Sequence, residues 1–285
     1  MSDLRPKPEP APTKRNGDLR LRLASTAVLL PLALACALVG SWPAYGLAAS
    51  GAAVVFAEWA HVVGRSDGLV PRRFDVVLGA VFVALAALVA GSSGLVAGLL
   101  VALVGFAGVA GLSRSRWLAS GVVYAAALGI PIAALRADPA HGLKGLIVLL
   151  ALVWATDSVA FFAGRSIGGP KLWPQVSPKK TWSGSIGGLV GGVVVAFAVA
   201  ILAGVPASLG LGMVLVLLSL ASQAGDLFES AVKRHFNKKD SSDIIPGHGG
   251  MMDRVDGLVF AGTLAILIGV LHGGLDAIGA GVLIW

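Results

Sequence analysis

Long apolar runs alternate with short polar segments along the chain, from residue 23 almost to the C-terminus. Each run has about 17–22 residues, enough at about 1.5 Å per helical residue to cross a hydrocarbon layer of about 30 Å. The pattern therefore predicts an all-α, polytopic integral membrane protein with about nine transmembrane helices. The helices are expected at residues 23–40, 44–63, 75–91, 94–111, 117–135, 143–163, 184–204, 207–224 and 257–275.

Composition supports a membrane protein and narrows the classes of function. Hydrophobic residues make up 56% and charged residues 13% of the 285 residues, whereas soluble domains carry about 25% charged residues. Residues 1–22 are Pro-rich and charged, which predicts a disordered cytoplasmic tail. Residues 23–285 are expected to form a single transmembrane domain. The lone Cys36 excludes an internal disulfide and a zinc site built from cysteines.

The distribution of basic residues predicts the orientation of the chain. With a cytoplasmic N-terminus and nine alternating spans, all Lys and Arg residues except Arg136 and Lys144 fall on the cytoplasmic side. This asymmetry is typical of membrane proteins, whose cytoplasmic loops are enriched in Lys and Arg. It also accounts for the net charge of +7, so we expect no nucleic-acid partner.

Polar motifs are concentrated in two segments, residues 154–188 and 223–257. The first segment contains the candidate residues Asp157, Ser177, Lys179, Lys180 and Thr181. An ionised carboxylate within or at the edge of a span is costly unless it is compensated, so Asp157 and Asp226 are strong functional candidates. A structural ion pair with a neighbouring helix is the alternative for both.

The second segment has the highest density of charge. Its candidate residues are Asp226, Ser230, Lys233, Arg234, Lys239, Asp240, His248, Gly249, Gly250, Asp253, Arg254 and Asp256. Asp253 and Asp256 are three residues apart, so on a helix they share one face, which suits a hard cation. Ordinary helix N-terminal charges are the alternative. The basic residues suit polyanions or lipid headgroups.

The glycines and two other polar residues complete this picture. Gly249 and Gly250 allow a backbone to approach a phosphate closely. For His248, whose spacing to His235 fits no familiar metal site, we expect a role in loop structure or phosphate contact. Glu58, within an apolar span, is a lesser candidate for which a structural role is the preferred interpretation. Carboxylates, cations and glycines together predict metal-assisted phosphate chemistry at a membrane surface.

The order and spacing of these residues resemble the phosphatidate cytidylyltransferases, also called CDP-diacylglycerol synthases. Their signature is Ser, two residues, Lys-Arg, four residues, a basic residue with Asp, and later His-Gly-Gly and Asp-Arg-x-Asp. Every spacing is kept here between Ser230 and Asp256. Asp157 and the Ser177–Thr181 stretch are similar to other motifs of the family, as is Gly225–Leu227. The resemblance is strong in the C-terminal half and only general in the N-terminal spans.

Two positions depart from the family. Phe161 stands where the family often has Tyr, and Ser183 stands where it often has Glu. Both positions lie beside the motifs rather than at their charged centres. The departures leave the roles of these two residues open and do not affect the activity that the resemblance implies.

The resemblance implies an enzyme that transfers the cytidylyl group of CTP to phosphatidate, giving CDP-diacylglycerol and pyrophosphate at the cytoplasmic face of the plasma membrane. It implies that Asp226, Asp253 and Asp256 hold Mg²⁺, with K⁺ as a candidate second cation. The phosphates of the two substrates would contact the basic residues Lys179, Lys180, Lys233, Arg234, Lys239 and Arg254. Asp157 would orient one of the lysines. A homodimer within the lipid bilayer is compatible with the family.

Three other functions were compared with this one. A transporter would carry charges on both membrane faces and paired broken helices, whereas the motif charges here are all predicted on one face. A CDP-alcohol phosphotransferase would continue Asp256-Gly257 with Ala-Arg two residues later, which this chain does not. A CTP-dependent polyprenol or lipid kinase stays open, because it also moves phosphate from CTP to a lipid.

Overall fold

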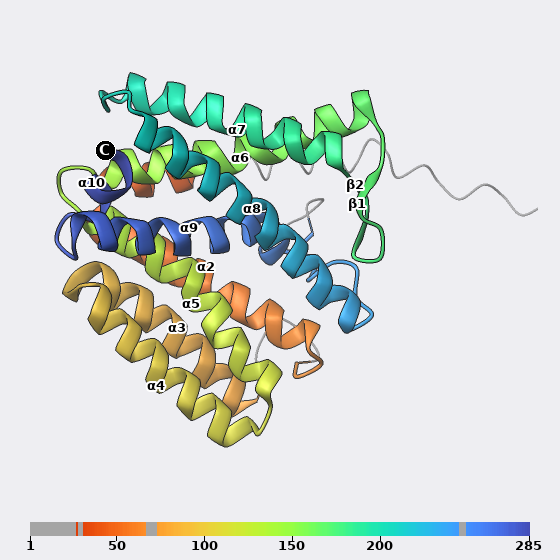
Figure 1. Cartoon of the computed structure of the whole chain (residues 1–285). Coiled ribbons are helices and arrows are strands. Elements are labelled where there is room, and N and C mark those ends of the chain that lie inside the picture. The colour runs from red at the N-terminus through yellow and green to blue at the C-terminus, as the bar shows by residue number, and fades with distance from the viewer. Residues whose placement is uncertain (1–26, 28–30, 67–72, 245–248) are drawn as a thin grey trace, which may run out of the picture.

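The computed structural model describes residue 27 and residues 31–66, 73–244 and 249–285. Residues 31–39 are helical and are followed by nine helices and one hairpin. The elements are α2 (Ser41–Val62), α3 (Phe74–Ser93), α4 (Leu95–Ser113), α5 (Arg116–Ala137), α6 (Gly142–Ile167), β1 (Lys171–Trp173), β2 (Ser177–Thr181), α7 (Trp182–Leu202), α8 (Leu209–His235), α9 (Met252–Gly273) and α10 (Ile278–Leu283). The long helices run side by side as one bundle (Figure 1).

The predicted fold class is confirmed as an all-α, polytopic membrane protein. Among the described residues, seven helices, α3 to α9, are long and apolar enough to cross a membrane. The predicted second span coincides with α2, which has 22 residues but is not among the seven. The predicted first span extends into residues outside the described ones. The count of nine spans and the tail at residues 1–22 therefore stay predictions.

Helices α6, α8 and α9 extend beyond the apolar runs that predicted them. α6 continues to Ile167, α8 continues to His235, and α9 begins at Met252. The end of α8 is amphipathic, so a hydropathy pattern alone places its boundary about three turns too early. As a result, most of the charged motif in residues 223–257 lies on two helices rather than in a loop.

Close contact between α6 and α7 depends on small residues. Gly184, Gly188 and Gly192 recur every fourth residue along α7. A Cβ atom at Gly188 would lie 2.6 Å from the carbonyl oxygen of Thr156 on α6, so a larger side chain would separate the helices. Small residues at this spacing are common at membrane helix contacts, where van der Waals packing replaces the hydrophobic effect.

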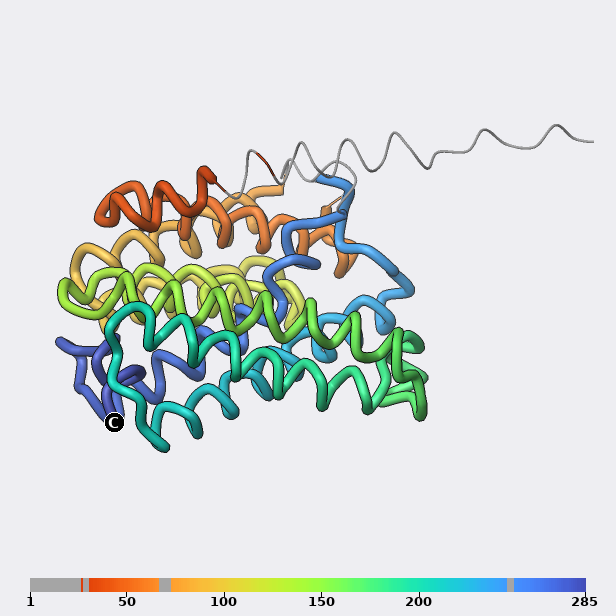
Figure 2. Tube along the Cα trace, turned by 90° about the horizontal axis from the view of Figure 1, so that it is seen from above, coloured from red at the N-terminus to blue at the C-terminus, as the bar shows by residue number. Residues whose placement is uncertain are grey.

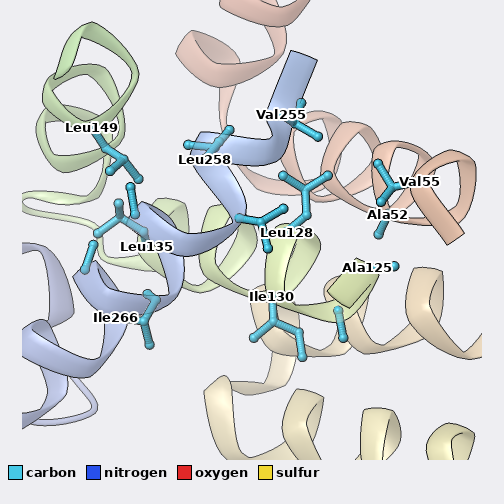
Figure 3. Packing of buried hydrophobic residues seen from close by; sticks show 14 of the residues in the cluster. Ala52, Val55, Ala125, Leu128, Ile130, Leu135, Leu149, Val255, Leu258 and Ile266 are labelled. Atoms are coloured by element: carbon cyan, nitrogen blue, oxygen red, sulfur yellow. The ribbon is translucent and has the colours of Figure 1, made fainter. Parts of the chain in front are cut away.

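The centre of the bundle is formed by α5 and α9. Figure 3 shows Leu128, Ile130 and Leu135 of α5 packed against Leu258 and Ile266 of α9. Side chains from α2 and α6 complete this cluster. Because α9 carries part of the charged motif at its N-terminal end, the apolar core fixes that end relative to the N-terminal helices.

The hairpin β1–β2 was not predicted from the sequence. Its strands pair antiparallel, with Lys171 opposite Thr181 and Trp173 opposite Ser177. It connects α6 to α7 and lies at the same end of the bundle as the segment between α8 and α9 (Figures 1 and 2). α10 lies at the opposite end. The two predicted motif segments therefore meet at one end of the molecule.

Candidate active site

A cleft of about 550 Å³ opens at the hairpin end, between α6, the hairpin, α7 and α8. Its charged lining residues are Asp157, Arg165, Lys171, Lys179, Lys180 and Asp226. Four cations and two carboxylates thus face one space. A space of this size with an excess of positive charge suits a small, highly phosphorylated ligand.

Lys180 and Asp226 form an ion pair within the cleft. Lys180 extends from β2 and Asp226 from α8, and their side chains are 27% and 29% exposed. Ser230, one turn further along α8, lies with its hydroxyl 3.5 Å from Asp226 Oδ1. Because the pair is partly open to the cleft, a phosphate could replace Asp226 as the partner of Lys180, and a cation could replace Lys180 as the partner of Asp226.

Two more carboxylates lie near this ion pair. Asp157 and Asp256 are each repelled by Asp226 and attracted by Lys180. Asp256 is buried, and its Oδ1 accepts a hydrogen bond of 2.7 Å from Gly257 N. Gly225 allows α8 to pack closely against α9 at Asp256, because a Cβ atom at position 225 would clash with the Asp256 carbonyl oxygen. The local excess of negative charge is suited to a cation.

Arg254 on α9 adds a further cation near Asp157. Its side chain is exposed, and it attracts the Asp157 carboxylate. The cleft wall from α6 is thus electrostatically coupled to the first turn of α9. The prediction that Asp157 orients a lysine is compatible with its attraction to Lys180.

A second, more buried network surrounds Lys233. Its ammonium group contacts Glu229 Oε2 at 2.9 Å and forms a hydrogen-bonded ion pair with Asp253 Oδ1. The other oxygen of Asp253 accepts hydrogen bonds from Ser241 Oγ at 2.9 Å, Gly250 N at 3.0 Å and Ser241 N at 3.1 Å. The Lys233 side chain is only 10% exposed. Lys233 and Asp253, predicted from the signature, are therefore brought together by α8 and α9.

The other predicted residues of the signature are less tightly held. Arg234, Lys239 and Asp240 are exposed on the surface of this end, and Arg234 Nη1 donates to Lys238 O at 2.9 Å. Gly249 has a positive φ of 81°, a conformation that favours glycine. His248 lies outside the described residues. The exposed cations Arg234 and Lys239 are available to polyanionic ligands or lipid headgroups.

The hairpin segment contributes several of the predicted residues to the cleft. Lys179, Lys180 and Thr181 all line it. Thr181 is also buried and caps α7, with its Oγ1 accepting from Gly184 N at 3.1 Å. Ser177 begins β2 opposite Trp173. Ser183, one of the two departures from the family pattern, hydrogen-bonds Thr181 Oγ1 at 3.0 Å.

Four polar or charged residues that line the cleft were not predicted as site residues from the sequence: Arg165, Lys171, Ser185 and Gln223. Ser185 on α7 donates to the side-chain oxygen of Gln223 on α8. Both residues interrupt apolar spans, and a polar side chain within a span is itself a signal of a functional or helix-pairing role. Their hydrogen bond joins the two helices on either side of the cleft.

The fit of these residues to a magnesium ion is partial. Within the described part of the chain, no group of three or more His, Cys, Asp or Glu side chains is arranged to hold a metal ion. Mg²⁺ in phosphate-transfer sites commonly uses one or two carboxylates and completes its shell with substrate phosphates and water. Asp226 and Asp256 fit such a two-carboxylate site. Asp253 fits less directly, because both its oxygens already accept from protein groups.

The fold and the charged cleft define a helical membrane protein equipped to bind phosphorylated substrates, and comparison with known proteins gives the class. Residues 20–272 match the cytidylyltransferase family, so the chain belongs to that family. The family resemblance of the motifs is thereby confirmed.

Several curated proteins similar to this chain are named phosphatidate cytidylyltransferase. A phosphatidate cytidylyltransferase of Brucella abortus is 45% identical over 168 residues, which cover 59% of this chain and 62% of that protein. One of Bacillus subtilis is 44% identical over 121 residues, covering 42% of this chain and 45% of that protein. One of Haemophilus influenzae is 44% identical over 129 residues, covering 44% and 45%. The chain thus spans less than two thirds of the length of these relatives.

Proposed function

We propose that this protein transfers the cytidylyl group of CTP to phosphatidate, giving CDP-diacylglycerol and pyrophosphate. The observation that carries the proposal is the cleft in which four cations meet Asp157 and Asp226 at one end of a membrane-embedded bundle. The relatives named phosphatidate cytidylyltransferase support the choice of substrates.

The proposed reaction does not require a general base. A phosphate oxygen of phosphatidate attacks the α-phosphorus of CTP, the bond from that phosphorus to the bridging oxygen breaks, and pyrophosphate leaves. The nucleophile is already an anion, so the barrier lies in bringing two polyanions together in line. Cationic side chains lower that barrier by neutralising charge. Lys179 and Lys180 in the cleft are proposed for the triphosphate.

Four further cations, which belong to the signature, are proposed for both substrates' phosphates. They are Lys233, Arg234, Lys239 and Arg254, which lie on α8, on α9 and in the segment between them. Asp226, Asp253 and Asp256 are proposed as the magnesium ligands, with K⁺ as a candidate second cation. Bound Mg²⁺ would supply charge neutralisation at the phosphates. In the structure, Lys180 forms an ion pair with Asp226 and Lys233 forms one with Asp253.

The proposed placement in the membrane follows the basic residues. We propose nine spans, a cytoplasmic N-terminus and an active site that faces the cytoplasm from the plasma membrane, with residues 23–285 as one catalytic domain. The asymmetry of Lys and Arg supports this orientation. The cleft must then open to the cytoplasm for CTP and to the bilayer for the acyl chains. A homodimer is part of the proposal on family grounds alone.

The test is product analysis with purified protein in mixed micelles. CTP and Mg²⁺ are supplied with phosphatidate, or with diacylglycerol or undecaprenol in parallel. We expect pyrophosphate and CDP-diacylglycerol from phosphatidate alone, and no turnover in excess chelator. CDP with a phosphorylated lipid from the alcohols would show a CTP-dependent lipid kinase instead. Full turnover in excess chelator would exclude the metal.

A further inference from the structure

We infer that Glu58 is a positioning residue, whose buried carboxylate fixes the start of α9 and the segment before it and so sets the positions of Asp253 and Lys233. The inference rests on the proposed function for its catalytic consequence. Glu58 belongs to α2, far from the signature in sequence, and the signature motif does not include it.

The Glu58 carboxylate is fully buried, accepts from three groups of the signature region and lies close to a fourth. Oε2 accepts from Met252 N at 2.6 Å and lies 3.4 Å from Ser241 Oγ. Oε1 accepts from Met251 N at 2.9 Å and from Ser242 Oγ. One side chain from the N-terminal half thus holds residues that are 183 to 194 positions away in sequence.

Glu58 serves as the N-terminal cap of α9. The first backbone N–H groups of a helix have no acceptor within the helix. Met251 occupies the cap position with an apolar side chain, and Glu58 supplies the missing acceptor from another helix. A carboxylate at this place is also favoured by the helix dipole. The start of α9 is therefore defined by α2.

The Ser241 hydroxyl links Glu58 to Asp253. It lies 2.9 Å from Asp253 Oδ2 and 3.4 Å from Glu58 Oε2. Gly250 lies between the same two carboxylates, where a Cβ atom would be 2.8 Å from Glu58 Oε1 and 3.1 Å from Asp253 Oδ2. A shift of the Glu58 carboxylate would therefore move Ser241 or Gly250, and with them the hydrogen bonds that orient Asp253 toward Lys233.

The end of α2 that carries Glu58 is itself anchored. The neighbouring Trp59 donates from Nε1 to Trp117 O at 2.7 Å, and its ring lies 4.9 Å from that of Tyr124 on α5. A functional side chain is best positioned when its own element is held by packing and hydrogen bonds. Glu58 meets that condition, so its removal should affect the signature region rather than α2.

Asp138 provides a matched control at the opposite end of the bundle. Its buried carboxylate accepts from Ala140 N and His141 N, each at 2.9 Å, and from Gly279 N of α10, also at 2.9 Å. It thus joins segments distant in sequence by the same chemistry as Glu58, but away from every predicted site residue. A purely structural role for Glu58 predicts equal behaviour of the two carboxylates.

The experiment compares Glu58→Gln, Glu58→Asp, Ser242→Ala and Asp138→Asn in the full chain. Turnover per folded protein, KM for both substrates and backbone hydrogen exchange are measured in mixed micelles. For Glu58→Gln we expect a kcat about 10²-fold lower, since a misplacement of about 1 Å can have that effect. KM should change by less than about threefold, because misplaced Asp253 and Lys233 weaken contacts with the transition state more than contacts with the bound substrates.

The other variants distinguish a positioning role of Glu58 from a purely structural one. Ser242→Ala removes one donor of Glu58 and should lower kcat by about tenfold, within the range for one lost charged hydrogen bond. Glu58→Asp, which keeps the charge, should recover part of the loss. Hydrogen exchange should increase at residues 241–244 and 249–252 in Glu58→Gln, and at residues 138–142 in Asp138→Asn. Asp138→Asn should keep its kcat per folded protein.

Several outcomes would overturn the inference. One is a kcat within about twofold of the unmodified protein in Glu58→Gln. Another is an equal fall in kcat for Asp138→Asn, which would show a structural role only. Unchanged hydrogen exchange at residues 249–252 in Glu58→Gln would show that Glu58 does not position the start of α9, whichever reaction the protein catalyses. Failure of the proposed function is separate, because the unmodified protein would then form no CDP-diacylglycerol.

Discussion

The two ends of the bundle use their charged residues differently. At the hairpin end, charged side chains contact other charged side chains, as in Lys180 with Asp226 and Lys233 with Asp253. At the opposite end, charged side chains contact the backbone. Arg136 Nε donates to Ala37 O at 2.7 Å, and Asp138 accepts from three backbone N–H groups. The two ends are marked by the hairpin and by α10 in Figure 1.

The difference separates exchangeable charges from fixed ones. An ion pair between side chains can give up one partner to a ligand phosphate or a cation without changing any secondary structure. A charge that caps backbone groups can leave only if the local fold opens. Desolvated ion pairs contribute little net stability, so their concentration at one end points to function. Glu58 and Asp253 combine the two behaviours at the hairpin end. Glu58 caps backbone N–H groups there, and Asp253 accepts from backbone N–H groups as well as from Lys233.

The largest effect is expected from the carboxylates of α9. Asp253→Asn and Asp256→Asn should each lower turnover by about 10³-fold or more, because charge stabilisation at phosphates is a major part of catalysis. The protein should stay folded and inserted. The measurement is CDP-diacylglycerol formation per folded protein.

The control for these variants is Asp138→Asn. It removes a buried carboxylate from the opposite end and should lower the melting temperature while turnover per folded protein is kept. Near-normal turnover in Asp253→Asn or Asp256→Asn would remove that residue from the metal site. It would also weaken the contrast between the two ends.

A smaller effect is expected from the cleft lysine. Lys180→Met should raise KM for CTP by about 10- to 100-fold, because a charged hydrogen bond contributes about 1.5–3 kcal/mol. Lys144→Met, at the opposite end, should leave KM unchanged. Steady-state kinetics with varied CTP measure the difference. Equal KM values for the two variants would show that Lys180 serves only to neutralise Asp226.

The close contact of α8 and α9 allows a third test. Gly225→Ala places a methyl group against the Asp256 carbonyl oxygen, which should lower the free energy of unfolding by about 1–3 kcal/mol. Turnover should fall by about tenfold, because Asp226 and Asp256 move apart. Thermal unfolding and turnover are measured together.

Gly269→Ala, on α9, is the matched control. Its added methyl group would meet the Ile278 carbonyl oxygen at the opposite end of α9. A similar loss of stability is expected, with turnover per folded protein unchanged. If both variants lost turnover equally, general loosening of α9 would explain the result better than the separation of the carboxylates.

These comparisons show what the sequence could and could not predict. The apolar runs located the membrane helices, because crossing a bilayer requires a fixed length of apolar chain. They placed the end of α8 too early, because its last turns are amphipathic. The hairpin that carries Lys179 and Lys180 was missed, since its strands have only three and five residues.

Contacts between residues far apart in the sequence were the other feature that could not be predicted. The motif spacing brought Asp253 and Lys233 into one hypothesis, because the family signature contains both. The role of Glu58 depends on a contact between residues more than 180 positions apart, which no local pattern encodes. The isolated carboxylate in an apolar helix was a signal, but it did not identify the partners.

The last test concerns the side of the membrane on which each end of the bundle lies. Its variants are expected to have the smallest effect on activity. In a Cys36→Ala background, Pro206→Cys and Asp243→Cys place thiols at exposed positions on opposite ends of the bundle. Asp243 is preferable to Ser241, which is buried among the hydrogen bonds of Glu58 and Asp253. Turnover should stay within about twofold of the unmodified protein, as for most exposed sites.

A membrane-impermeant thiol reagent then reports the orientation. The asymmetry of basic residues predicts that Pro206→Cys labels from outside and Asp243→Cys only from the cytoplasmic side. The reverse pattern would overturn the orientation but keep the contrast between the ends. Labelling of both positions from one side would contradict the contrast itself, because the exchangeable charges and the backbone-bound charges would then face the same compartment.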